Sequence, residues 1–118
     1  MTESRRESLP PLPLATFHIL MSLAGEERHG YAIIQDVAAR TGGELVMSPG
    51  TLYRSIQRML EQGLIVESRR RPPAALDDER RRYYRITALG ESAARAEAAR
   101  LTQLVKLARA SGIVPGHA

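Results

Sequence analysis

The sequence predicts a mainly α-helical fold with one small β-hairpin and a long final helix. Residues 48–63 place apolar side chains at helical spacing. Residues 64–68 and 82–86 are short β-branched or aromatic runs typical of strands, and an arginine-rich polar segment separates them. Residues 88–110 then keep a helical pattern without interruption. With 118 residues, the chain fits one domain with a small core.

The helix within residues 48–63 has clear start and stop signals. Ser48 is a capping residue, and Pro49 follows at the first helical position, where its fixed φ is favourable. Gly63 is suited to end the helix in a left-handed conformation. The apolar stripe consists of Leu52, Ile56, Met59 and Leu60. The opposite face is polar and cationic and consists of Thr51, Arg54, Ser55 and Arg58.

Such a helix can rest on a core and present its polar face to a DNA groove, although taken alone it is more often an ordinary surface helix. The order of helix, strand, basic loop and strand favours the first interpretation, because it is typical of a winged helix-turn-helix. In that fold the helix enters the major groove and the hairpin contacts phosphates. Arginines at 69–71 and 80–82 flank the loop, but acidic residues at 77–79 can pair with them.

Composition narrows the function classes. The formal net charge of +4 suits a polyanionic partner such as double-stranded DNA. Without cysteine there is no disulfide, thiolate metal site or thiol nucleophile, as expected in a reducing cytoplasm. No signal-like cleavage site or bilayer-length apolar run occurs, so we expect a soluble cytoplasmic protein with no membrane partner. Catalytic and metal-binding spacings are also missing, so the sequence predicts no enzyme, metal or cofactor.

The remaining elements follow from local patterns. Residues 1–11 are expected to form a disordered arm, and residues 14–24 a helix so apolar that another surface should cover part of it. Residues 31–40 are predicted as a second helix, and residues 44–47 can form a short strand that pairs with the hairpin. The expected core stripe of the second helix is Tyr31, Ile34, Val37 and Ala38.

The final helix is predicted to span residues 88–110, capped by Thr87 and followed by a flexible tail at 111–118. About 20 residues cover about 30 Å, which is more than so small a domain can pack against. The alternative is packing on its own domain, but the length favours a second copy of the chain. Part of the first helix is expected to join the final helix in this contact. The expected dimer contacts are Phe17, Met21, Ala98, Leu101, Leu104, Val105 and Ala108.

Four segments in this order resemble the PadR family of bacterial transcriptional regulators. They are residues 29–31, 48–53, 61–65 and 81–90. The resemblance covers residues 12–110 and implies a winged helix-turn-helix at 12–87 followed by a dimerisation helix at 88–110. It also implies repression as the usual activity. This loop is longer than the common wing and carries acidic residues, and the chain has no tryptophan of the kind that lines a drug-binding pore in some relatives.

The resemblance also implies roles for single residues. Thr51 and Arg54 would contact base edges or phosphates, and Arg58 the DNA backbone. The hydroxyl of Tyr53 and the backbone amide of Gly30 would approach phosphates, although both residues could instead serve packing alone. The predicted DNA-binding residues are Gly30, Ser48, Thr51, Tyr53, Arg54, Arg58, Arg69, Arg70, Arg80 and Arg81.

Together, these features predict a sequence-specific DNA-binding regulator that acts as a homodimeric repressor on an inverted repeat. A small-molecule inducer stays open as a partner, and its identity is not given by the sequence. The alternative function is a protein-interaction module that dimerises through its long helix without specific DNA binding. Salt-sensitive DNA binding distinguishes the two.

Overall fold

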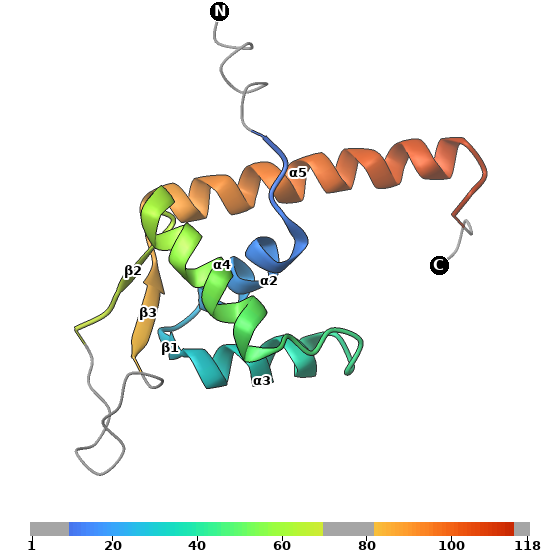
Figure 1. The fold of residues 1–118 in the computed structure, drawn as a ribbon. Helices are drawn as coiled ribbons and strands as arrows, with labels where there is room; N and C mark the ends of the chain where they lie inside the picture. Colours follow the sequence, from blue (N-terminus) through green and yellow to red (C-terminus); the bar gives the residue numbers. More distant parts are fainter. Residues whose placement is uncertain (1–9, 70–81, 115–118) are drawn as a thin grey trace, which may run out of the picture.

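The computed structural model describes residues 10–69 and 82–114 and has the predicted fold class: a mainly helical domain with a small sheet (Figure 1). Within these residues, the elements are α2 (Leu14–Leu23), β1 (Arg28–His29), α3 (Gly30–Arg40), α4 (Pro49–Gln62), β2 (Ile65–Glu67), β3 (Tyr83–Ile86) and α5 (Ala88–Ala110). The predictions for residues 1–9, for Arg70, Arg80 and Arg81, and for residues 115–118 lie outside the described part of the chain.

The sheet is antiparallel, with strand order β1-β3-β2. The prediction that residues 44–47 form its third strand is wrong, because Arg28–His29 takes that place beside β3. Gly42 and Gly43 both adopt positive φ and turn the chain sharply after α3. The backbone amide of Leu45 then donates to the Thr41 hydroxyl at 3.0 Å, so a side chain rather than a neighbouring strand satisfies it.

The core lies between α2, α3, α4 and the inner face of the sheet (Figure 1). On α3 the predicted stripe is partly wrong: Ile33 and Val37 are buried, whereas Tyr31 is 55% exposed. The side of α3 that faces the core carries Gly30, Ile33 and Val37. Gly30 allows α4 to approach this side closely. The buried apolar side chains are Ile19, Leu20, Leu23, Ile33, Val37, Met47, Leu52, Ile56, Met59, Leu64, Ile65 and Tyr84.

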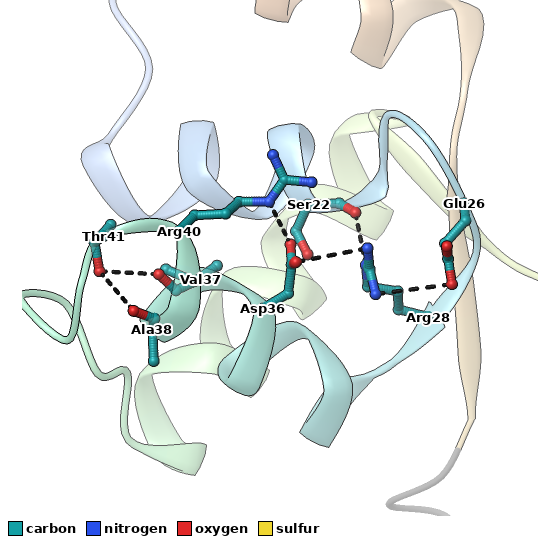
Figure 2. A network of polar contacts seen from close by, with 8 residues as sticks. All are labelled: Ser22, Glu26, Arg28, Asp36, Val37, Ala38, Arg40 and Thr41. Atoms are coloured by element: carbon teal, nitrogen blue, oxygen red, sulfur yellow. Dashed lines mark hydrogen bonds and ion pairs between the residues drawn. The ribbon is translucent and has the colours of Figure 1, made fainter.

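A polar network fastens α2, β1 and α3 together (Figure 2). Arg28 donates to the Ser22 carbonyl oxygen at 2.9 Å and lies 3.6 Å from the Asp36 carboxylate. Arg40 contacts the same carboxylate at 2.7 Å. Burial raises the pKa of Asp36, but the Ser22 hydroxyl, Arg40 and Arg28 lower it more, so it lies below its ordinary value. The Ser22 hydroxyl lies near this carboxylate without the geometry of a full hydrogen bond.

The end of α4 is joined directly to the start of α5. The Thr87 hydroxyl donates to the carbonyl oxygens of Gly63 and Leu64, at 2.6 and 3.0 Å, and accepts from the Gly90 amide at 3.0 Å. This confirms Thr87 as the cap of α5. Gly90 packs so closely that a Cβ there would overlap with the Leu64 carbonyl oxygen and lie 2.8 Å from Ile86 Cγ1.

The C-terminal half of α5 extends past the other helices (Figure 1). Before this overhang, Glu97 is only 5% exposed, accepts from the Leu12 amide at 3.1 Å and pairs with Arg100. The hydrogen bond from Arg100 lowers the pKa of Glu97, and the Leu12 amide adds to this against the effect of burial. Glu97 therefore ties the segment before α2 to α5. Within residues 10–69 and 82–114, every helix is too short or too polar to span a bilayer.

Candidate nucleic-acid interface

Both ends of α4 are built as the sequence predicts. The Ser48 side chain accepts from the Thr51 amide at 3.1 Å and donates to the Thr51 hydroxyl at 3.1 Å. Pro49 occupies the first turn, and Gly63 ends the helix at φ 78°. The cap therefore satisfies a backbone donor of the first turn and holds the Thr51 hydroxyl at its outer edge.

The rotation of α4 about its axis is fixed by its buried side. Leu52, Ile56 and Met59 are at most 2% exposed. The opposite side carries exposed polar and charged residues, which are Arg54, Gln57, Arg58 and Glu61. A Cβ on Gly50 would lie 3.4 Å from Nη1 of Arg54, so this guanidinium extends back over the first turn of the helix. Two cations and a cap hydroxyl thus share one exposed face.

Gly30 and Tyr53 hold α3 and α4 together at their contact. Gly30 is buried at the start of α3, and a Cβ there would lie 2.9 Å from Tyr53 Cζ and collide with the Tyr53 hydroxyl. The half-buried Tyr53 ring therefore lies directly against the first turn of α3. His29 caps this turn by accepting from the Ala32 amide at 3.1 Å, a role that was not predicted.

The described part of the wing carries cations on its outward side. Tyr84 is buried and Tyr83 half-buried, as expected for neighbouring strand residues that face opposite sides of a sheet. Arg85 is exposed on β3, and Arg69 is exposed just after β2. Arg85 was not among the predicted DNA-binding residues, although its place next to the inward Tyr84 indicates an outward direction. Arg82 forms an ion pair with Glu67 at 3.6 Å, which reduces its positive field.

An open cavity of about 370 Å³ lies between α4 and the two strands of the wing. It is lined by Tyr53, Ile56, Gln57, Leu60, Glu67, Arg82 and Tyr84. Burial, followed by the proximity of Tyr53 and Glu67, raises the pKa of Tyr84, so this phenol is neutral in the folded protein. Gln57 is exposed and contributes to this lining, and it was not among the predicted site residues.

The predicted dimer residues lie on α2 and α5. Leu104 and Val105 are 47% and 42% exposed, and Leu107, which was not predicted, is 53% exposed. Ala98 is exposed as well. The half-buried members of the set are Phe17, Met21, Leu101 and Ala108. Within the single chain, these side chains therefore form an incompletely covered apolar surface.

Solved structures with the same fold include transcription regulators. A PadR family transcription regulator from Clostridium difficile R20291 aligns over 82% of this chain and 96% of its own, with a TM-score of 0.69 and 22% identity. Bacillus subtilis PadR, solved in complex with operator DNA, aligns over 70% of this chain and 45% of its own, with a TM-score of 0.58 and 20% identity. These similarities confirm the winged-helix fold.

Sequence comparison gives the family. An uncharacterized protein X of Lysinibacillus sphaericus is 35% identical over 88 residues, which are 75% of this chain and 72% of that protein. The model of the transcriptional regulator PadR-like family matches residues 19–96, from the middle of α2 into α5. This match contains α3, α4 and both wing strands, and it confirms the resemblance found in the sequence. The chain belongs to the PadR-like family of transcriptional regulators.

Proposed function

We propose that this chain binds DNA sequence-specifically as a homodimer and represses transcription from an inverted-repeat operator. Its family consists of transcriptional regulators, so the prediction that it is not an enzyme is confirmed. The observation that supports DNA binding best is the outward face of α4, which presents Arg54, Arg58 and the capped first turn together.

The charges on this face suit phosphate and base contacts. Among residues 10–69 and 82–114, neither Arg54 nor Arg58 forms an ion pair, so no carboxylate in that part must be displaced before DNA binds. Arg69 and Arg85 are exposed on the neighbouring wing. Arginine binds phosphate oxygens or the O6 and N7 atoms of guanine, so both positioning and reading of the sequence are available.

A second copy of the chain is the partner we propose for α5. The C-terminal half of α5 extends beyond the core (Figure 1). Its side chains Leu104, Val105 and Leu107 would therefore remain about half exposed in a monomer. Pairing two such helices about a two-fold axis covers the same patch on both chains. The two α4 helices are then related by the same axis, and a two-fold protein matches an inverted-repeat site. Bacillus subtilis PadR, which shares this fold, was solved in complex with operator DNA, and this supports DNA binding by the present chain.

A nuclease-protection experiment on the DNA upstream of the coding region tests the proposal. We expect a symmetric protected segment, binding that weakens steeply with salt, and reduced transcription in vitro from a promoter that overlaps the segment. The Arg54→Ala/Arg58→Ala double variant should lose protection. The exposed Arg95→Ala variant, with a cation removed from α5 instead, should retain it. Absence of salt-sensitive binding in the wild-type protein would favour the interaction-module alternative, and increased transcription would indicate an activator.

A further inference from the structure

Gln57 is an exposed residue on the outward face of α4, on the side next to the wing. We infer that Gln57 reads an A·T base pair in each half-site and that Glu61 positions its amide. This inference rests on the proposed function, since it requires α4 to enter the major groove. It assigns a base preference to the helix.

The helix geometry places Gln57 within the face that meets DNA. With about 100° per residue, Arg54 points almost directly away from the buried side defined by Leu52, Ile56 and Met59. Gln57 is about 60° from Arg54 on the wing side, and Arg58 is about 40° away on the other side. Gln57 is therefore nearly as close to the centre of the outward face as Arg58, and its side chain is exposed.

Glu61 sets the direction of the Gln57 amide. Nε2 of Gln57 donates to Oε2 of Glu61 at 3.3 Å. A glutamine amide has two N–H donors and one carbonyl acceptor, so this bond leaves one N–H and the carbonyl for a ligand. It also opposes the flipped amide, in which the carbonyl oxygen would face the carboxylate. The amide therefore presents one donor and one acceptor in a fixed arrangement.

That arrangement matches adenine and opposes guanine. Adenine offers the N7 acceptor and the N6 amino donor in the major groove, and glutamine can pair with both. Guanine offers two acceptors at N7 and O6, so one of them would face the carbonyl oxygen of Gln57. The open cavity beside Gln57, between α4 and the wing strands, leaves its side chain room to align with a base edge.

Glu61 is a positioning residue rather than a base reader. Its exposed carboxylate lies one turn beyond Gln57, toward the end of α4, and is already the acceptor of the Gln57 amide. Its negative charge also repels phosphates, which keeps the last turn of α4 farther from the DNA than the first. The positions that can read bases are then confined to the part of the helix from Thr51 to Arg58.

Selection of binding sites from a random duplex pool tests the inference. The full-length wild-type protein should enrich an inverted repeat with an A·T pair at one position of each half-site. Gln57→Ala should enrich the same repeat with that position degenerate, which corresponds to a roughly 5- to 150-fold loss of discrimination there. The matched control is Gln62→Ala, which removes another exposed glutamine of α4 on a different side of the helix and should leave every position unchanged.

Two changes at Glu61 separate positioning from charge. Glu61→Ala removes the acceptor, so the Gln57 amide can flip and the position should accept G·C as well as A·T. Glu61→Gln keeps an acceptor oxygen but removes the charge, so it should retain A·T while binding all sequences more tightly. A purely structural role for Glu61 would lower the melting temperature and leave the base preference unchanged.

The results separate this inference from the proposed function. If the wild-type protein enriches no inverted repeat, the proposed function fails and the inference fails with it. If the repeat is enriched but Gln57→Ala selects the same bases at every position, only the inference is overturned. An A·T preference that survives in Glu61→Ala would keep Gln57 as a reader and remove the role of Glu61.

Discussion

Gly90 provides a direct test of packing at a single residue. In an exposed helix, replacing glycine by alanine stabilises by up to about 1 kcal/mol. At Gly90 the new Cβ would overlap with the backbone oxygen of Leu64, and backbone cannot move aside as a flexible side chain can. We therefore expect Gly90→Ala to destabilise the protein by about 1–3 kcal/mol, measured by thermal or urea denaturation.

The control for this prediction is Gly25→Ala. A Cβ on Gly25 would meet no heavy atom within 4 Å, and the residue does not adopt positive φ. The free energy of unfolding of the Gly25→Ala variant should stay close to that of the wild-type protein. A Gly90→Ala variant that melts at or above the wild-type temperature would show that the contact between α5 and Leu64 is looser than described.

Asp36 makes stability depend on pH. Its folded-state pKa is below the ordinary value, so its ion pairs stabilise the folded state above the unfolded-state pKa of about 3.9 and lose this effect as pH falls through the lower folded value. Asp36→Asn should therefore cost about 1–3 kcal/mol between roughly pH 5 and 8. Denaturation of both proteins across pH should show this difference shrinking below about pH 4. A pH-independent difference would mean that packing, not charge, explains the loss.

Different residues of α4 should contribute to general DNA affinity and to preference for the operator sequence. Arg58→Ala, and separately a combined Arg69/Arg70→Ala change, should weaken binding to all sequences alike and reduce the salt slope by about 1 for each phosphate that is no longer neutralised. Arg54→Ala or Thr51→Ala should instead relax preference for the operator, by about 1–3 kcal/mol where a bidentate bond to a base is removed. Titrations of operator and unrelated DNA over a salt series measure both effects.

These outcomes also test the wing. An unchanged salt slope after the Arg69/Arg70→Ala change would mean that the loop does not touch phosphates in the complex. Its acidic residues at 77–79 would then have neutralised the arginines beside them. An Arg54→Ala variant that weakens all sequences equally would move Arg54 to the phosphate-binding group.

The helix α5 should lose its partner when a charge enters the proposed contact. Val105 is 42% exposed in the single chain, and a second copy would bury it. Because an unpaired buried charge costs several kcal/mol, Val105→Asp should weaken dimerisation by at least about 100-fold and abolish operator binding. Sedimentation and gel shifts measure the two effects. Lys106→Asp places the same carboxylate at an exposed position that is about 100° or more around α5 from Leu104, Val105 and Leu107, and this variant should remain dimeric.

For the molecule as a whole, the test is the spacing of half-sites. Two α4 helices related by a two-fold axis should enter successive major grooves, about 10 base pairs or roughly 34 Å apart, or a small multiple of that distance. Inserting about 5 base pairs between the half-sites moves one groove to the far side of the duplex. Binding should then fall close to the non-specific level in a gel shift. Equal affinity for both spacings would indicate independent monomers and contradict the dimeric mechanism.

Features with local signals were predictable from the sequence. Ser48, Pro49 and Gly63 define the ends of α4 by their own chemistry, and Thr87 does the same for α5, so the structure confirms them. The strand β1 was missed because two residues have no periodicity, and only pairing with β3 creates it. On α3, Val37 was predicted correctly, but the buried line runs through Gly30 and Ile33 rather than through Tyr31, because it depends on close contact with α4 at Gly30.

In the candidate site, too, features with a local signal could be predicted and features that depend on other side chains could not. Arg54 and Arg58 could be placed on the outward face from periodicity alone, and their exposure agrees with it. Their roles in DNA binding stay predictions. Gln57 lies between a buried residue and an arginine in the sequence, and its contact with Glu61 becomes visible only with the side chains in place. Glu97 is buried beside the distant Leu12 amide, a contact that no local pattern in the sequence indicates.

The contact between the end of α4 and the start of α5 couples the orientations of the two helices. Thr87 and Gly90 hold the start of α5 against Gly63 and Leu64, which directly follow α4, so a tilt of one helix must carry the other with it. A tilt of roughly 10° moves a point about 30 Å along α5 by about 5 Å. Small changes in how two α5 helices cross would thus be magnified into the separation of the two α4 helices. Side chains far from DNA, at the crossing, would then set the operator spacing that each dimer accepts.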